Sequence, residues 1–147
     1  MRSKLYQSYL DEEVLSANPL KLVELLYRGA LDSTVSARRF LSLGDIRARS
    51  RAINKAMEIL AELACSLNHE AGGEVSRNLS ELYAYMQTLL IEANTKQSDP
   101  PLAETERLLA TLLEAWSESA KAATRDENRP GTFMPDVPTY EPVSCAY

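Results

Sequence analysis

Residues 62–94 read ELACSLNHEAGGEVSRNLSELYAYMQTLLIEAN. Apolar residues recur three and four positions apart on both sides of the Gly72-Gly73 pair, which is the spacing of amphipathic helices. We therefore interpret this stretch as a helical hairpin, with one helix before the glycine pair and another after it. Helices elsewhere in the chain are expected to cover its apolar faces.

The composition favours helices over sheets. The chain has 147 residues with only five glycines and two phenylalanines, and it is rich in Leu, Ala and Glu, which are good helix formers. A chain of this length can fold as one domain with a core sufficient for independent stability. The composition therefore predicts an all-α protein.

Two boundary signals define the helices that precede the glycine pair. Asn18-Pro19 combines a good N-cap residue with a proline at the first helical position, so a helix is expected from there to about Leu41, stopping at Gly44. Asp45 has the residue type of an N-cap for a second helix, which should run to about Asn68.

The last helix and the C-terminal tail are marked by prolines. Asp99-Pro100-Pro101 repeats the cap-then-proline signature, and this helix should fade near Ala123. Residues 124–147 have four prolines and few apolar side chains, which predicts a disordered tail. Four helices of about 20 residues with short links, together spanning 18–123, fit an antiparallel up-down-up-down four-helix bundle.

The N-terminal residues 1–17 are predicted to form a short capping segment or helix. Their apolar residues, which include Tyr6, Tyr9 and Val14, are too few for an independently stable helix. The helix that follows has apolar and small side chains over roughly 240° of its circumference, whereas a surface helix needs little more than about 100°. The N-terminal segment is the obvious cover for this surplus.

The charge distribution argues against nucleic acid as a partner. The net charge is −5, and phosphate binding requires an excess of Lys and Arg. One local exception, here named the basic corner, lies around the first interhelical turn; it is either a solvated end of the bundle or a docking patch for an acidic partner segment. The basic corner comprises Arg38, Arg39, Arg47, Arg49, Arg51 and Lys55.

The sequence also gives no sign of membrane insertion. No apolar run approaches the roughly 18 residues that a membrane span needs, and the N-terminus lacks the apolar region of a secretory signal. We therefore expect a cytosolic protein.

The sequence offers no catalytic or cofactor-binding constellation. Its single histidine excludes a di-iron bundle site. Cys65 and His69 are four apart on one predicted helix face, but a metal needs three or four ligands, so an ordinary buried thiol and a surface imidazole are the favoured interpretation. A phosphotransfer role for His69 is disfavoured because Gly72-Gly73 should end its helix. Neither a nucleophile elbow nor a phosphate-binding glycine loop is present.

The motifs resemble those of the FliS family of flagellin-specific export chaperones. They occur in the right order and spacing from about Tyr6 to Trp116, and their combination is specific although each piece is weak. They are Tyr6, Tyr9, Val14, Ala17-Asn18-Pro19, Leu22, Leu26-Tyr27, Gly29-Ala30, Glu62-Leu63, Ser66-Leu67-Asn68, Gly72-Gly73, Asn78-Leu79, Leu82-Tyr83, Ala93-Asn94 and Ala115-Trp116.

This resemblance implies a cytosolic, non-enzymatic chaperone that needs no cofactor or metal. Such a protein binds the disordered C-terminal segment of flagellin, prevents premature polymerisation and delivers flagellin to the flagellar type III export apparatus. It also implies that an N-terminal segment covers apolar surface in the free protein and is displaced by flagellin, a role that falls here on Tyr6, Tyr9 and Val14.

We further hypothesise that flagellin helices lie in apolar grooves floored by the second and third helices. The candidate lining is Ile59, Leu63, Leu82 and Met86, for each of which a plain core position is the competing interpretation. The alternative function is a homodimeric helical adaptor without a flagellin client. Export-gate components and other flagellar regulatory proteins remain candidate partners, and whether such regulators bind the basic corner is left open.

Overall fold

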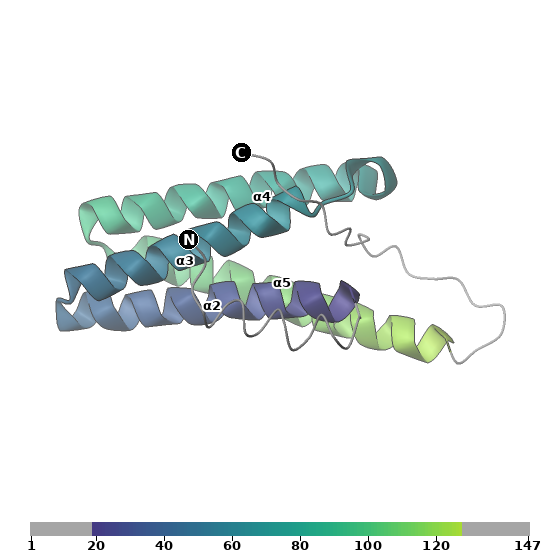
Figure 1. The fold of residues 1–147 in the computed structure, drawn as a ribbon, viewed down its shortest axis with the longest axis horizontal. Helices are drawn as coiled ribbons and strands as arrows, with labels where there is room; N and C mark the ends of the chain where they lie inside the picture. The colour runs from purple at the N-terminus through teal and green to yellow at the C-terminus, as the bar shows by residue number, and fades with distance from the viewer. Residues whose placement is uncertain (1–18, 128–147) are drawn as a thin grey trace.

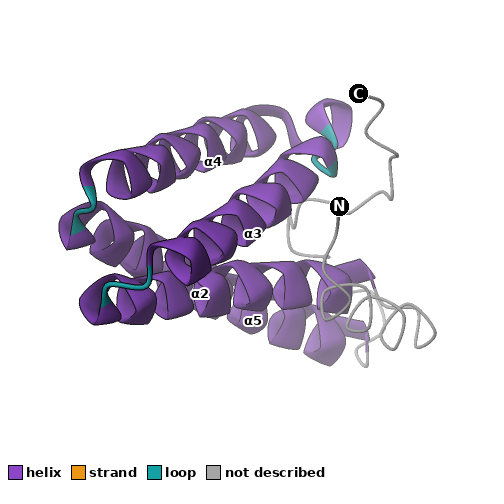
Figure 2. Ribbon diagram, turned by 60° about the vertical axis from the view of Figure 1, so that its left-hand side comes forward, coloured by secondary structure: helices purple, strands orange, loops and turns teal. Residues whose placement is uncertain are grey.

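The computed structural model describes residues 19–127, which form four helices joined by short loops (Figures 1 and 2). The part of the chain between these limits contains no strand. The all-α class predicted from composition is therefore confirmed. The helices are α2 (Pro19–Leu43), α3 (Ile46–Cys65), α4 (His69–Lys96) and α5 (Asp99–Glu127).

The helices form an antiparallel four-helix bundle. Each helix packs against its neighbours in the chain, and α5 closes the ring by packing against α2. Figure 1 shows that successive helices run in opposite directions. The diagonal pairs, α2 with α4 and α3 with α5, have no Cα atoms within 8 Å of each other. This arrangement confirms the predicted up-down-up-down topology.

The turn between α2 and α3 follows the predicted signals. Gly44 has a φ of 72°, a conformation that glycine adopts without steric cost. The Asp45 carboxylate accepts a hydrogen bond from the backbone N–H of Ala48 at 3.1 Å, which caps the start of α3. The two helices can therefore reverse direction within two residues.

The connection between α3 and α4 differs from the prediction. α3 ends at Cys65, and α4 begins at His69, before the glycine pair. The Asn68 side chain accepts hydrogen bonds from the backbone N–H groups of Glu70 and Ala71 at 3.1 Å each, so the first turn of α4 forms at once. Gly73 (φ 53°, ψ −122°) is non-helical and separates this short first segment from the main part of α4 at a kink, so the predicted break at the glycine pair is present.

The start of α5 is as predicted, but its end is not. Gln97 ends α4 in the left-handed conformation (φ 52°), and α5 begins at Asp99. α5 continues to Glu127, beyond the predicted end near Ala123. The predicted N-terminal capping segment and the tail from residue 128 onward lie outside the described residues, so both remain predictions.

The core receives side chains from all four helices. The largest apolar side chains that are almost fully buried are Leu26, Tyr27, Ile53, Ile59, Leu60, Tyr83, Met86, Leu90, Leu102 and Leu109.

No helix within residues 19–127 combines the length and the apolarity needed to span a membrane.

Candidate functional site

The N-terminal half of the candidate site cannot be placed. Tyr6, Tyr9 and Val14 precede residue 19 and lie outside the described part of the chain. Their assignment as a cover for apolar surface therefore stays a prediction.

Ile59 and Leu63, the candidate groove residues on α3, lie in the core. Their side chains are 1% and 3% exposed. Ile59 packs against the backbone of α2 at Gly29, where an added Cβ would lie 3.2 Å from Ile59 Cδ1. Gly29 thus permits α2 and α3 to approach closely, a role that the sequence did not reveal although Gly29-Ala30 belongs to the family motif.

Leu82 and Met86, the candidate groove residues on α4, differ in burial. Met86 is fully buried, whereas Leu82 is half-buried and packs against the edge of the same core cluster. Ile59 and Leu63 on α3 and Met86 on α4 thus belong to one core cluster against which Leu82 packs; we refer to these residues and their apolar neighbours on α3 and α4 as the α3–α4 apolar layer. Of these four side chains, only that of Leu82 is appreciably exposed to solvent.

Tyr27, Tyr83 and Trp116 form a buried network whose contacts the sequence did not reveal. The Tyr27 and Tyr83 hydroxyls hydrogen-bond to each other across the bundle diagonal, and Trp116 meets the Tyr27 ring edge-on at 6.1 Å between centroids. Burial raises the pKa of both tyrosines. Trp116 Nε1 donates to the Leu20 carbonyl at 2.9 Å, so the network links α2, α4 and α5.

A second polar cluster connects the start of α3 to the end of α4. Arg49 is 3% exposed, and its Nε donates to Asn94 Oδ1 at 3.2 Å. Ser50 Oγ donates to the same oxygen at 3.2 Å. The guanidinium lies at the C-terminal end of α4, where the helix dipole favours a positive charge. Arg49 is therefore a structural residue of the bundle.

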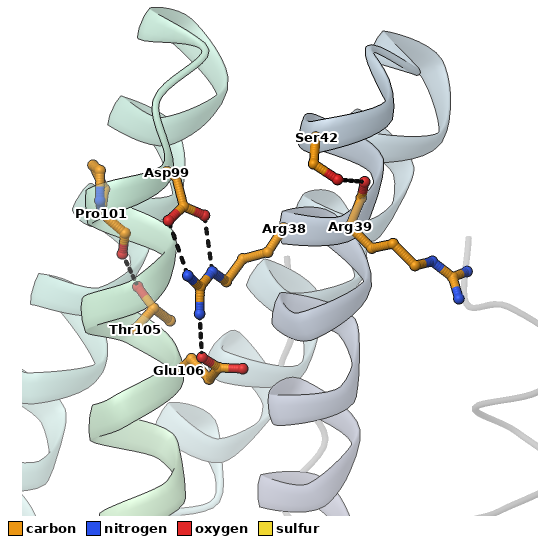
Figure 3. Close-up of polar contacts among 7 residues, drawn as sticks. All are labelled: Arg38, Arg39, Ser42, Asp99, Pro101, Thr105 and Glu106. Atoms are coloured by element: carbon orange, nitrogen blue, oxygen red, sulfur yellow. Dashed lines mark hydrogen bonds and ion pairs between the residues drawn. The ribbon is translucent and has the colours of Figure 1, made fainter.

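An ion-paired cluster joins the end of α2 to the start of α5 (Figure 3). Arg38 donates to both carboxylate oxygens of Asp99, at 2.8 and 2.9 Å, and to Glu106 at 2.5 Å. These hydrogen bonds raise the pKa of Arg38 and lower that of Asp99. Two members of the basic corner, Arg38 and Arg49, thus have partners inside the bundle.

The predicted geometry of Cys65 and His69 is wrong. Cys65 is the last residue of α3 and His69 the first of α4, so they do not share a helix face. Among residues 19–127, no group of three or more His, Cys, Asp or Glu side chains is placed to bind a metal ion. The features that stand out in this region are packing and helix capping.

Comparison with known proteins identifies the family. The sequence model of the family described as "Flagellar protein FliS" matches residues 2–123. The chain is 40% identical over 124 residues to "Flagellar secretion chaperone FliS" of Salmonella typhimurium, covering 84% of this chain and 92% of that protein.

Two further relatives extend this similarity across bacteria. "Flagellar secretion chaperone FliSB" of Pseudomonas aeruginosa is 36% identical, covering 77% of this chain and 90% of the relative. "Flagellar secretion chaperone FliS" of Bacillus subtilis is 29% identical, covering 86% and 93%. The chain belongs to the FliS family of flagellar secretion chaperones.

Proposed function

We propose that this chain binds the C-terminal disordered segment of flagellin in the cytosol. Binding prevents premature polymerisation, and the chaperone then delivers flagellin to the flagellar type III export apparatus. The similarity to flagellar secretion chaperones over residues 2–123 is the observation that carries this proposal. The protein acts as a chaperone and not as an enzyme.

The apolar layer between α3 and α4 supports a helix-binding mode. Half-buried apolar side chains border the buried ones on both helices, so an amphipathic segment that lies against them extends an existing core. These border residues are Met57 and Ala64 on α3, Leu79 and Leu82 on α4, and Leu67 in the loop between the two helices.

Occupation of the deeper positions requires a rearrangement. Ile59, Leu63 and Met86 are at most 3% exposed, so a bound flagellin helix reaches them only after the material that covers them has moved. Ile59 also packs against α2 at Gly29, so the helices themselves must shift. We propose that displacement of the N-terminal segment that contains Tyr6, Tyr9 and Val14 permits this shift. Flagellin then replaces an internal cover with its own apolar face.

The test compares two substitutions on opposite faces of α4. Leu82 borders the apolar layer, whereas Ile91 is 53% exposed and nine residues later, which places it about 180° away around the helix. We expect Leu82→Glu to weaken binding of the cognate flagellin C-terminal peptide about tenfold or more, because a carboxylate enters an apolar contact. Ile91→Glu should leave the affinity unchanged. Isothermal titration calorimetry gives both the affinity and a stoichiometry near one to one.

Two results would count against the proposal in different ways. Equal affinities for Leu82→Glu and Ile91→Glu, with both variants folded by circular dichroism, would exclude the α3–α4 layer as the binding surface. A wild-type protein that fails to bind the peptide at low salt would exclude the flagellin function itself. Stable dimers of the free protein would then favour the homodimeric adaptor.

A further inference from the structure

Positive charge is concentrated at the end of the bundle formed by the α2–α3 turn. Residues 33–57 contain six basic residues and one acidic residue, Asp45, although the whole chain has a net charge of −5. The Asp45 carboxylate is engaged in capping α3 through the Ala48 N–H. The α2–α3 turn and its flanking residues therefore carry a local charge opposite to that of the whole chain, and Asp99 and Glu106 at the start of α5 pair with Arg38.

The structure divides the arginines of this region into paired and unpaired ones. Arg38 is bound to Asp99 and Glu106, and Arg49 is buried against Asn94. Arg39, Arg47 and Arg51 are exposed and form no ion pair with any residue between 19 and 127, although the Arg39 guanidinium lies over the Phe40 ring, 5.2 Å from its centroid. Figure 3 shows Arg39 directed away from the Arg38 cluster and from α5.

Two aliphatic side chains are exposed among these arginines. Leu43 is 70% exposed and Ile46 is 56% exposed, the highest values for large hydrophobic residues in the described part of the chain. They stand at the end of α2 and the start of α3, on either side of the two-residue turn. Neither side chain is required by the turn, whose geometry depends on Gly44 and Asp45.

The arginines and the aliphatic pair are close enough to act together. Arg39 lies one helical turn before Leu43, about 6 Å along the axis of α2. Arg47 adjoins Ile46, and Arg51 follows one turn later on the same side of α3. We name these five residues, Arg39, Leu43, Ile46, Arg47 and Arg51, the exposed tip.

We propose that the exposed tip binds an acidic amphipathic helix of a protein partner. The aliphatic pair contacts apolar residues of that helix, and the arginines bind its flanking carboxylates. Arginine suits this role because its planar guanidinium donates two parallel hydrogen bonds to a carboxylate. The tip lacks the Trp and Tyr side chains typical of membrane-interface anchors, which favours a protein over a lipid surface.

This surface is separate from the proposed flagellin site. The candidate lining residues Ile59, Leu63, Leu82 and Met86 belong to the core layer between α3 and α4, whereas the tip lies at the α2–α3 turn. A second protein can therefore bind while flagellin is present. The inference does not depend on flagellin being the client.

The test uses a synthetic helical peptide of about three heptads, with Leu on one face and Glu flanking it, labelled for fluorescence anisotropy. We expect the full-length protein to bind it at low salt, with affinity falling as salt is added. Combining Arg39→Glu, Arg47→Glu and Arg51→Glu should weaken binding about tenfold or more, and Leu43→Ser with Ile46→Ser should also weaken it. Both variants should still bind the flagellin C-terminal peptide as the wild type does.

A matched variant controls for net charge. Arg77, Arg107 and Lys121 are exposed on α4 and α5, and their combined replacement by Glu changes the net charge equally. This control should bind the acidic peptide with an affinity close to that of the wild type. Equal weakening in both triple variants would overturn the proposal, because only overall charge would then matter.

Three other results would also overturn the proposal. The first is no binding of the acidic peptide by the wild type. The second is binding of phosphatidylserine vesicles that the tip substitutions abolish while peptide binding is unaffected, which would make the tip a lipid-binding surface. The third is a self-association, measured by light scattering, that the tip substitutions abolish without affecting peptide binding; the occupant would then be a second copy of this chain.

Discussion

Tyr27 on α2 and Tyr83 on α4 are almost fully buried, and their hydroxyls meet across the diagonal of the bundle. A buried hydroxyl without a partner is costly, so each tyrosine requires the other to be in place. Arg49 and Asn94 are coupled in a similar way at the C-terminal end of α4. At the scale of single residues, these contacts fix the register of helices whose packing is otherwise apolar and less specific.

The Arg38–Asp99 ion pair makes stability depend on pH. The hydrogen bond from Arg38 lowers the pKa of Asp99 in the folded state. In the unfolded state the pKa of an Asp carboxyl is about 3.9, so the Asp99 carboxyl loses its proton more readily when the protein is folded. The stabilisation is therefore fully present above the unfolded pKa and is lost as the pH falls through the folded pKa.

We expect Asp99→Asn to lower the free energy of unfolding at pH 7 by at most about 1 kcal/mol, because the two side chains are 35% and 46% exposed and water screens the pair. The difference from the wild type should shrink towards zero in acid. Urea unfolding followed by circular dichroism at several pH values measures it, with exposed Asp32→Asn as the control. A difference that does not change with pH would contradict this account.

At the scale of the secondary-structure element, local contacts at the start of α4 explain its kink. The Asn68 side chain caps the first turn, and the Asn68 backbone carbonyl accepts hydrogen bonds from the Gly72 N–H at 2.8 Å and from Ser76 Oγ at 3.0 Å. A Cβ at Gly72 would lie 1.8 Å from Ser76 Oγ. Each glycine therefore has its own function, Gly72 in giving room to Ser76 and Gly73 in adopting a positive φ.

We expect Gly73→Ala to destabilise the protein by about 1–3 kcal/mol. Its φ of 53° with ψ of −122° is unfavourable for a residue with a Cβ, although no atom lies within 4 Å of the added methyl group. The cost therefore comes from the backbone and not from a clash. Thermal and urea unfolding measure it, and the neighbouring exposed Glu74→Ala should have little effect. A neutral Gly73→Ala would show that the kink relaxes without cost.

At the scale of the whole molecule, the bundle combines a well-packed interior with apolar side chains at its border. The proposed chaperone function makes use of this arrangement, because it assigns the border residues to different covering segments in the free and bound states. In the proposed function, residues 1–17 and flagellin compete for the same layer. The exposed tip at the α2–α3 turn stays available in either state.

Deletion of residues 1–17 tests this competition. We expect the truncated protein to bind the flagellin C-terminal peptide more tightly, because flagellin no longer has to displace a cover. It should also self-associate more, since apolar surface becomes accessible. Calorimetry and light scattering measure the two effects, and circular dichroism verifies the fold. An unchanged affinity and an unchanged monomer fraction would argue against a covering role for Tyr6, Tyr9 and Val14.

The candidate site was less predictable than the fold. Periodicity identified Ile59, Leu63, Leu82 and Met86 as apolar positions of α3 and α4, but it cannot distinguish a core residue from a groove residue, since both lie on the apolar face of a helix. The structure buries three of them and leaves Leu82 at the border. Whether they contact flagellin remains a prediction.

The sequence by itself determined the helical class, the topology and the turns at Gly44 and Asp99, because periodicity and capping are local properties of the chain. Only the tertiary structure decided which polar residues pair across helices, as Tyr27 does with Tyr83 and Arg38 with Asp99. It also decided that a short helical segment capped by Asn68 precedes the kink at Gly73, where the pattern predicted only a break. These outcomes depend on contacts between residues distant in sequence or on the capping geometry of a neighbouring turn, which residue types and spacing alone do not specify.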